Sequence, residues 1–460
     1  MKTITKFSNL LLIALLLIPS LLVAQNSSGG GEANPNLKTN IKSLKKFQDN
    51  RFGMFIHWGP VALRGTEISW SRGVQVPKED YDALYKEFNP VLFDATKWVN
   101  AAKDAGMKYI VLTARHHDGF CLWDSEYTDY DMGNTLYGKG ILKPLAEACK
   151  KEGIDFGIYY TICDWHHEDY PVKYPDKEYE YHIEKDITNP AVKAKMDRYI
   201  VYMKNQLKEL IDNYNPTLFW FDGEWEWAWT HEMGMDLYAY LRGLDDELLI
   251  NNRVDKGREG MAGITKSYKY AGDYATPEQE IGKFDIENAW ESCITIANQW
   301  AWKPNDKLKT TQQCIQTLVQ TVGGDGNLLL NVGPMHDGRI EQRQIDRLKE
   351  IGDWLKVNGD AIYGTRGGPY LPTVNYVSTH KNNTIFIHLL KKPEDQLKLK
   401  LPKGYKVKKA YFLDDNVALD YSVKKRVLNI LLPENLPNAH VSVIALEMNK
   451  PLVDLATIEN

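Results

Sequence analysis

Polar side chains that could take part in a reaction follow several short apolar runs of the chain. Asp222 comes directly after Leu-Phe-Trp-Phe, and His57 comes after Met-Phe-Ile. The same pattern includes Arg115, His116, His117 and Asp118, then Tyr160, and finally Asn251, Asn252 and Arg253. A carboxylate is costly to bury unless a partner or a function holds it. We therefore interpret Asp222 as a functional residue, the alternative being a helix N-cap or a salt-bridged strand end.

Tryptophan is abundant around these polar groups, and all 13 Trp residues lie at or before Trp354. Ring faces beside hydrogen-bonding groups suit a carbohydrate, whose C–H faces stack while its hydroxyls need donors and acceptors. About half of the Trp side chains are expected in the core. Trp225, Trp227 and Trp229 alternate around Glu226, which indicates a loop at the rim of a site instead.

Cleavage of a glycosidic bond requires two carboxyl groups. One attacks the anomeric carbon or activates water, and the other protonates the leaving oxygen. Asp222 is the candidate nucleophile, and Glu278 and Glu291 are candidates for the acid. Glu224 and Glu67 also stand near the motifs, and spacing alone does not choose among these carboxyl groups.

A metal site is the main alternative for the histidines. His57, His116, His117 and Asp118 have side chains that bind zinc or iron in hydrolytic barrels. Adjacent histidines diverge along a strand, however, and are not a usual ligand spacing. Neutral histidines that bind sugar hydroxyls explain the pattern without a metal, so no metal or other cofactor is expected.

These groups need a scaffold that brings the ends of separate runs together. The sequence predicts strands at 53–59, 109–113, 155–160, 218–222, 248–252 and 328–331. It predicts helices at 96–105, 141–152, 191–213, 235–244, 310–322 and 340–357, and it leaves 256–290 unassigned. Alternating strands and helices, with continuously apolar strands, predict a parallel sheet covered on both faces. About eight such units favour an α/β fold of the (β/α)8 TIM-barrel type, with its site at the carboxyl ends of the strands. A doubly wound sheet is the alternative, but no Gly-x-Gly-x-x-Gly loop follows the first strand.

The pattern changes after Gly367. Short strands are predicted at 384–389, 408–412, 427–431 and 441–445, separated by polar turns. Such a series predicts an all-β sandwich, which we interpret as structural. The predicted organisation is a signal peptide at 1–24, a linker at 25–40, a catalytic barrel at 41–366 and a C-terminal β-sandwich at 367–460.

The amino-terminal segment resembles a secretory signal. Lys2 and Lys6 precede an apolar run at 10–23 that ends at Ala24. The run is shorter than the ~18–20 residues that a membrane span needs. We expect an exported protein, periplasmic or secreted, without a membrane span, the alternative being an uncleaved anchor.

Composition narrows the range of partners. The net charge of −5 argues against a protein held on nucleic acid by phosphate contacts.

Five cysteines without a Cys-x-x-Cys spacing predict buried free thiols, the alternative being one disulfide. The sequence carries no signature of an oligomeric state.

Several motifs together resemble the α-L-fucosidases of glycoside hydrolase family 29. They are 52–59 (FGMFIHWG), 105–120 (AGMKYIVLTARHHDGF), 218–223 (LFWFDG), 251–253 (NNR), 290–293 (WESC) and 326–334 (GNLLLNVGP). The resemblance runs in order over residues 40–365. It implies a retaining exo-hydrolase that removes terminal α-L-fucose from oligosaccharides or glycoconjugates without a metal.

The resemblance also implies roles for individual residues. Asp222 would be the nucleophile, and Glu67 would accept hydrogen bonds from sugar hydroxyls. The pocket would be lined by His57, His116, His117, Tyr160, Trp220 and Arg253, with apolar walls from Trp123 and Trp300. The family often has Glu-Trp where this chain reads Glu67-Ile-Ser-Trp70, so the aromatic contact is expected to move to Trp70 or to be lost.

The acid/base residue is assigned through the same resemblance. The Thr-Pro-Glu motif after Gly272-Asp-Tyr274 is similar to the acid/base loop of the family, which favours Glu278, with Glu291 second. Three other functions stay open at this point: a retaining glycosidase for a related sugar such as β-D-galactose, a metal-dependent hydrolase, and an inactive sugar-binding protein.

Overall fold

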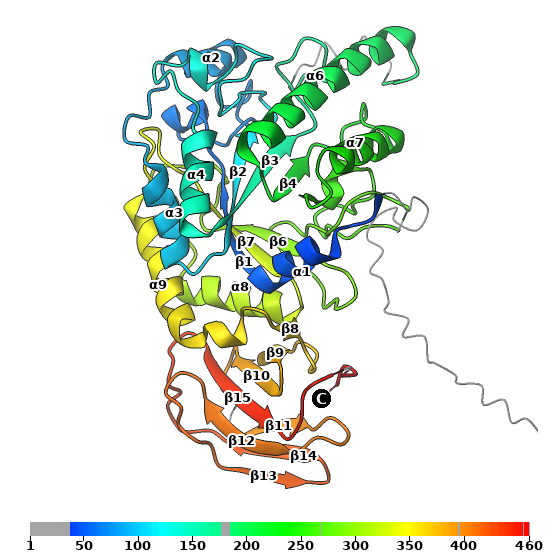
Figure 1. Cartoon of the computed structure of the whole chain (residues 1–460). Helices are drawn as coiled ribbons and strands as arrows, with labels where there is room; N and C mark the ends of the chain where they lie inside the picture. Colours follow the sequence, from blue (N-terminus) through cyan, green and yellow to red (C-terminus); the bar gives the residue numbers. More distant parts are fainter. Residues whose placement is uncertain (1–36, 176–184, 268, 394–395, 454, 460) are drawn as a thin grey trace, which may run out of the picture.

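The computed structural model describes residues 37–175, 185–267, 269–393, 396–453 and 455–459. The predicted signal peptide and most of the predicted linker lie outside the described residues. Two regions follow one another along the chain, a barrel-like α/β region and an antiparallel β region (Figure 1).

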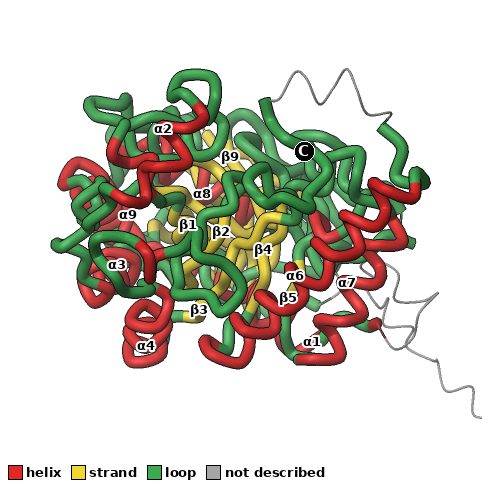
Figure 2. Tube along the Cα trace, turned by 90° about the horizontal axis from the view of Figure 1, so that it is seen from above, coloured by secondary structure: helices red, strands yellow, loops and turns green. Residues whose placement is uncertain are grey.

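The first region is built on a parallel sheet, as the continuously apolar runs predict. Its seven strands pair in the order β5-β4-β3-β2-β1-β7-β6, and every pair is parallel. The strands are β1 Phe52–Ile56, β2 Tyr109–Arg115, β3 Asp155–Thr161, β4 Leu218–Asp222, β5 Leu249–Ile250, β6 Glu291–Thr295 and β7 Asn327–Val332. Seen along the strands, the sheet lies in the centre with helices around it (Figure 2). The α/β barrel-type fold is therefore confirmed.

Helices connect the strands and cover the outside of the sheet. They are α1 Ile41–Asn50, α2 Lys78–Ala83, α3 Ala95–Asp104, α4 Leu142–Glu152, α6 Pro190–Tyr214, α7 His231–Leu244, α8 Thr311–Gly323 and α9 Gln342–Asn358. Several of them begin at a residue whose side chain caps the helix, for example Thr310, which forms a capping box with Gln313 at the start of α8.

An irregular segment occupies the place of an eighth strand between β5 and β6. Tyr274 bridges to Asn251 beside β5, and Ala275 and Glu278 bridge to Trp290 and Cys293 beside and within β6. Backbone bonds repeat this arrangement, since Asn252 N donates to Tyr274 O and Cys293 N donates to Pro277 O. This segment lies within residues 256–290, which the sequence left unassigned, and we call it the closing segment because it closes the barrel.

Helix α1 covers the amino ends of the strands. Leu44 and Phe47 belong to the apolar cluster that fills the barrel interior. The Phe47 ring lies 5.6 Å from the Tyr109 ring and 4.7 Å from the Tyr274 ring. Apolar side chains of α1 thus reach into the barrel interior from its amino end.

The second region contains two antiparallel sheets, as expected for a sandwich. One has the order β12-β15-β10-β9-β8 and the other has β11-β14-β13. The strands are β8 Arg366–Gly367, β9 Tyr376–Lys381, β10 Thr384–Leu389, β11 Gln396–Lys400, β12 Val407–Phe412, β13 Tyr421–Lys424, β14 Val427–Leu431 and β15 Ser442–Met448. Their inward side chains form one apolar cluster between the sheets.

The two regions share part of their core. Val377 and Val443 of the sandwich belong to the same buried cluster as the outer face of the barrel. The Trp354 indole of α9 donates to Val441 O at 2.9 Å, and Val377 lies so close to Gly323 that a side chain there would collide with it. Helices α8 and α9 therefore join the barrel to the sandwich.

All five cysteines lie in described residues, and all are buried free thiols, as predicted. Within the described residues, no helix has the length and apolar character to cross a membrane.

Candidate active site

A cavity of about 200 Å³ opens at the carboxyl ends of the barrel strands. Its lining comes from the ends of β1 to β4, from the turn after β5 and from the closing segment. The lining residues are Phe55, His57, Trp70, His116, His117, Tyr159, Trp220, Asp222, Trp225, Arg253, Arg258, Met261, Glu278 and Trp300. Nine of the thirteen site residues predicted from the sequence are among them.

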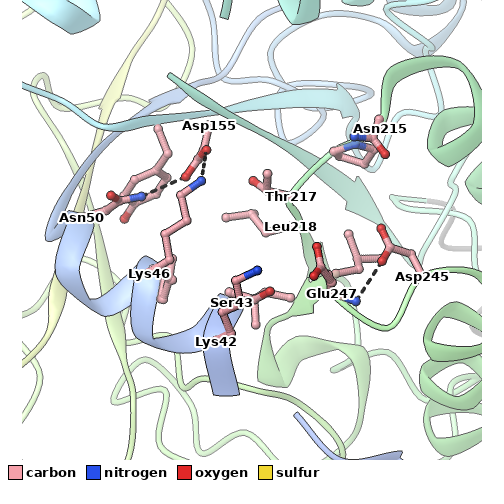
Figure 3. Close-up of a pocket in the computed structure, with 15 residues that line it drawn as sticks. Lys42, Ser43, Lys46, Asn50, Asp155, Asn215, Thr217, Leu218, Asp245 and Glu247 are labelled. Carbon is pink, nitrogen blue, oxygen red and sulfur yellow. Dashed lines mark hydrogen bonds and ion pairs between the residues drawn. The ribbon is translucent and has the colours of Figure 1, made fainter. Parts of the chain in front are cut away.

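A larger cavity lies at the opposite end of the barrel, under α1 (Figure 3). It has about 540 Å³, and Lys46 and Asn50 of α1 both bind Asp155 at the start of β3 there. None of the predicted site residues line it. We therefore place the candidate site in the smaller cavity, where carboxylates, histidines and aromatic rings converge.

One guanidinium joins the two carboxylates of the site. Arg253 donates from Nη1 to Asp222 Oδ1 and from Nη2 to Glu278 Oε2, each at 2.8 Å. The Arg253 guanidinium is itself held by Thr276 Oγ1 at 2.9 Å, and it lies 4.4 Å from the Trp220 ring centre. The two carboxyl groups are thus fixed on neighbouring nitrogens of one rigid fork.

The surroundings of Asp222 favour its ionised form. Burial opposes ionisation, but the charge of Arg253, with a smaller contribution from Arg258, outweighs it, so the pKa of Asp222 is lowered. The Tyr159 hydroxyl donates to Asp222 Oδ2 at 3.1 Å, and His117 Nε2 lies 3.7 Å from the same oxygen. Asp222 is a carboxylate facing a small cavity, which is what a nucleophile requires.

The position of Glu278 depends on a close backbone approach. Glu278 N donates to Met261 O at 2.8 Å. Gly263, at φ +66°, lies against Thr276, and a Cβ at Gly263 would sit 2.1 Å from the carbonyl carbon of Thr276. Only glycine permits this contact and this backbone angle together.

Three histidines line the cavity in their neutral form. His57 Nδ1 lies 2.6 Å from Asn331 Oδ1, His116 Nδ1 lies 2.6 Å from Ser69 Oγ, and His117 Nδ1 lies 2.7 Å from Thr161 Oγ1. Burial lowers the pKa of His57 to about 3 and that of His117 to about 4, and it also lowers the pKa of His116. Uncharged imidazoles remain as hydrogen-bonding groups. Within the described residues, no group of three His, Cys, Asp or Glu side chains is arranged to hold a metal ion.

Aromatic rings form both the floor and the rim. Tyr159 and Trp220 stack at 5.6 Å inside the cavity, and the Trp300 ring lies 4.8 Å from that of His57. At the rim, Trp70 and Trp225 are 40% and 41% exposed and stack at 6.3 Å. Trp70 thus contributes to the cavity wall, one of the two outcomes that the sequence left open, and Trp225 lies at the rim, where a loop was predicted.

Two residues predicted to line the pocket face away from it. The Tyr160 hydroxyl donates to Gln206 Oε1 at 2.8 Å behind β3, because successive side chains of a strand point to opposite faces. Tyr159 takes the place expected for Tyr160. Trp123 is fully buried, and its indole donates to Glu209 Oε2 at 2.9 Å in the core outside the sheet, so it provides no pocket wall.

Glu67 and Glu291 also differ from the expected roles. Glu67 accepts hydrogen bonds from the backbone N–H of Trp300 and of Ala301, each at 2.9 Å, and does not line the cavity. It fixes the loop that carries Trp300, because a buried carboxylate binds exposed backbone donors. Glu291 lies inside the barrel, where it accepts from the Tyr109 hydroxyl and from Trp220 Nε1 at 3.1 Å. It supports the cavity floor from below.

Four lining residues were not predicted from the sequence, namely Phe55, Tyr159, Arg258 and Met261. Phe55 and Tyr159 could have been found from strand alternation, counted back from His57 and from the end of β3. Arg258 and Met261 stand in the unassigned segment, where no periodicity indicates which side chains face the site.

Comparisons with known proteins agree on one family. Residues 22–360 match a family model described as Alpha-L-fucosidase. The chain is 31% identical over 386 residues to the plasma alpha-L-fucosidase of Pongo abelii, covering 78% of this chain and 79% of that protein.

Solved structures of alpha-L-fucosidases are also similar to this chain. The alpha-L-fucosidase isoenzyme 1 of Paenibacillus thiaminolyticus is 35% identical with a TM-score of 0.77, over 89% of this chain and 99% of that one. A GH29 alpha-L-fucosidase of Bacteroides thetaiotaomicron, trapped as a covalent intermediate with 2-fluoro-fucosyl fluoride, is 29% identical with a TM-score of 0.79, over 90% of this chain and 97% of that one.

The buried carboxyl group of Glu291 should make stability depend on pH. Burial raises its pKa from 4.5 to about 8, although the bonds from Tyr109 and Trp220 oppose the rise. A raised carboxyl pKa contributes stability that is complete below pH 4.5 and is lost as the pH rises to about 8. Glu291→Gln keeps the shape without titrating. We expect the melting temperature of this variant, minus that of the wild type, to increase steadily from pH 5 to pH 8.

Thermal unfolding of both proteins across that range measures the difference. Glu280→Gln, at an exposed glutamate of the closing segment, is the matched control and should show no such slope. A difference that stays flat with pH for Glu291→Gln would show that Glu291 does not titrate in this range.

Proposed function

The chain belongs to the α-L-fucosidases of glycoside hydrolase family 29, and on that basis we propose that it is a retaining exo-hydrolase that forms a covalent fucosyl intermediate on Asp222. The proposed substrates are oligosaccharides or glycoconjugates that end in α-L-fucose. The observation that carries the proposal is the single guanidinium of Arg253, which binds both Asp222 and Glu278 at one cavity.

The first step is attack by Asp222 on the anomeric carbon. Its lowered pKa keeps it ionised, and the hydrogen bond from Tyr159 fixes one of its oxygens. Glu278, in its carboxylic acid form, gives its proton to the leaving glycosidic oxygen and becomes a carboxylate, so the aglycone departs as an alcohol and a fucosyl ester remains on Asp222. Retaining enzymes hold the two carboxyl groups ~5–5.5 Å apart, a spacing compatible with two carboxylates on one guanidinium.

The second step reverses the role of Glu278. Esterification removes the negative charge of Asp222, which leaves Glu278 as the carboxylate beside the Arg253 cation. Glu278, a carboxylate since it gave up its proton in the first step, then takes a proton from the attacking water. Water adds to the anomeric carbon, fucose leaves with its original configuration, and Asp222 returns as a carboxylate.

Glu278 is proposed as the acid/base in preference to Glu291. Glu278 lines the cavity and reaches Arg253, whereas Glu291 is fully buried beneath Trp220. A group that exchanges protons with substrate and water needs access to both, and only Glu278 of these two has it.

The size of the cavity supports exo action. Its volume of about 200 Å³ is below the ~300–1,000 Å³ of pockets for drug-sized ligands. A floor of Phe55, Tyr159 and Trp220 ends the cavity inside the barrel, so a chain cannot pass through. One terminal sugar fits, and the rest of the glycan extends past the rim at Trp70 and Trp225.

Asp222→Ala should abolish turnover of a chromogenic α-L-fucoside. We expect kcat/KM to fall by at least about 10³-fold, because the nucleophile acts only in the transition state. Added azide should restore part of the activity and yield a fucosyl azide. Asp197→Ala removes an exposed aspartate of α6 and is the control with full activity.

The same assignment is tested on the wild type with a slow 2-fluoro-fucosyl fluoride. Mass spectrometry of a digest should find the label on the peptide that contains Asp222. A label on another peptide would refute the proposed nucleophile while leaving the family membership intact.

Glu278→Ala should lose about 10²- to 10⁴-fold in turnover of substrates with poor leaving groups. Fucosyl fluoride, whose leaving group needs no proton, should lose much less in the first step, and azide should accelerate the second. Glu280→Ala, two residues away and exposed, is the matched control. Azide rescue of Glu291→Ala in place of Glu278→Ala would reverse the assignment.

We also propose export to the periplasm or the medium, on the basis of the basic and apolar residues that precede Ala24. Expression of the full chain in a bacterium with a secretory pathway should yield a mature protein that begins at Gln25, as read by amino-terminal sequencing. A soluble protein that retains Met1 in the cytoplasm would contradict export.

A further inference from the structure

His57 and His116 both line the cavity, and each binds the scaffold through Nδ1. We propose that the scaffold holds them in opposite neutral tautomers, so that His57 Nε2 accepts a hydrogen bond from one sugar hydroxyl and His116 Nε2–H donates to another. Asn331 and Ser69 are then positioning residues, because each determines which ring nitrogen of its histidine carries the hydrogen.

The tautomer of His57 follows from the second bond of Asn331. Asn331 Nδ2 donates to Trp300 O at 2.8 Å, so its amide nitrogen faces a carbonyl and its Oδ1 faces His57. A turned amide would place two oxygens against each other at Trp300. Because Oδ1 only accepts, His57 Nδ1 must carry the hydrogen, and Nε2 is left with a lone pair.

The tautomer of His116 follows from the hydroxyl of Ser69. Asp118 N donates to Ser69 Oγ at 2.9 Å, and Oγ lies 2.6 Å from His116 Nδ1. Ser69 is fully buried, and its hydroxyl hydrogen has no other acceptor among the hydrogen bonds of the described residues. The Ser69 hydroxyl therefore donates to His116 Nδ1, which places the ring hydrogen on Nε2.

The loop that presents Ser69 is built to keep this geometry. Ser69 has φ +57°, a left-handed conformation that is uncommon for a residue with a side chain. Its N–H donates to the Tyr81 hydroxyl at 2.8 Å, and Tyr81 in turn donates to Asp118 Oδ2 at 2.5 Å. These two hydrogen bonds hold the strained turn in place and so fix the direction of the Ser69 hydroxyl.

Both rings are also neutral, as tautomer selection requires. Burial lowers the pKa of each, and the groups around them include His117, Asp222 and Arg253. In the part of the chain that the structure describes, Nε2 of neither ring has a hydrogen-bond partner, so both remain for a ligand.

The effect of the two tautomers on substrate specificity rests on the proposed function, because that function supplies a fucosyl ring as the ligand. The hydroxyl that meets His57 must donate, and the hydroxyl that meets His116 must accept. A sugar in which the first hydroxyl is replaced by fluorine loses that contact entirely, because fluorine cannot donate. Replacement of the second hydroxyl leaves a weak acceptor in place.

The tautomers can be read directly from the ¹⁵N spectrum of histidine-labelled wild-type protein near pH 7. His57 should show a protonated Nδ1 and an unprotonated Nε2, and His116 the reverse. Ring contacts assign the signals, since His57 packs on Phe55 at 4.5 Å and His116 stacks on Tyr159 at 5.3 Å. Equal tautomers at the two residues, or an imidazolium at either, would overturn the proposal.

Ser69→Gly tests the positioning role without adding strain, because glycine adopts the same backbone angle readily. The His116 signals should move toward a mixture of tautomers while those of His57 stay unchanged. The inhibition constant of free L-fucose should weaken by about three- to tenfold, the loss of one oriented hydrogen bond. Ser71→Ala, in the same loop but without a contact to His116, is the matched control.

Titration with L-fucose separates this inference from the proposed function. Histidine signals of the expected tautomers with no response to fucose would refute the proposed ligand and keep the tautomers. A clear response to fucose with unexpected tautomers would refute the inference and keep the proposed function.

Discussion

The site depends on one cation placed between two carboxyl groups. Arg253 binds Asp222 and Glu278 through neighbouring nitrogens and so brings both groups to one cavity. The planar fork also sets the distance between the two groups, which a flexible ammonium would not do. Thr276 and the Trp220 ring hold the guanidinium in turn, so the charge is fixed before any substrate arrives.

The surrounding fold can be understood as support for this arrangement. Asp222 ends β4, Arg253 follows β5, and Glu278 stands on the segment that closes the barrel between β5 and β6. Three consecutive positions around the barrel thus supply the cation and both carboxyl groups. The closing segment is irregular, and its close backbone contact between Gly263 and Thr276 places Glu278 at the cavity.

Much of the fold could be predicted from the sequence, because apolar strands and amphipathic helices have strong periodic signals. The positions of Asp222, His57 and Arg253 could be predicted as well, since each follows an apolar strand whose end must reach the mouth of a barrel. Tyr160 was misplaced by one position, because the predicted strand ended at Tyr160 whereas β3 runs to Thr161, and successive side chains of a strand point to opposite faces. The roles of Glu67 and Trp123 depend on partners more than 80 residues away, Trp300 and Glu209. No local pattern specifies such contacts.

The shared core at α8 and α9 has a consequence for how the chain is made. A ribosome releases the barrel first, yet the outer face of these two helices is covered by Val377, Val443 and other residues synthesised later. Until those residues are in place, apolar surface near Gly323 and Trp354 is uncovered, so the barrel reaches its final stability only after β15 has paired. A chain that lacks β15 therefore exposes this surface to chaperones and proteases.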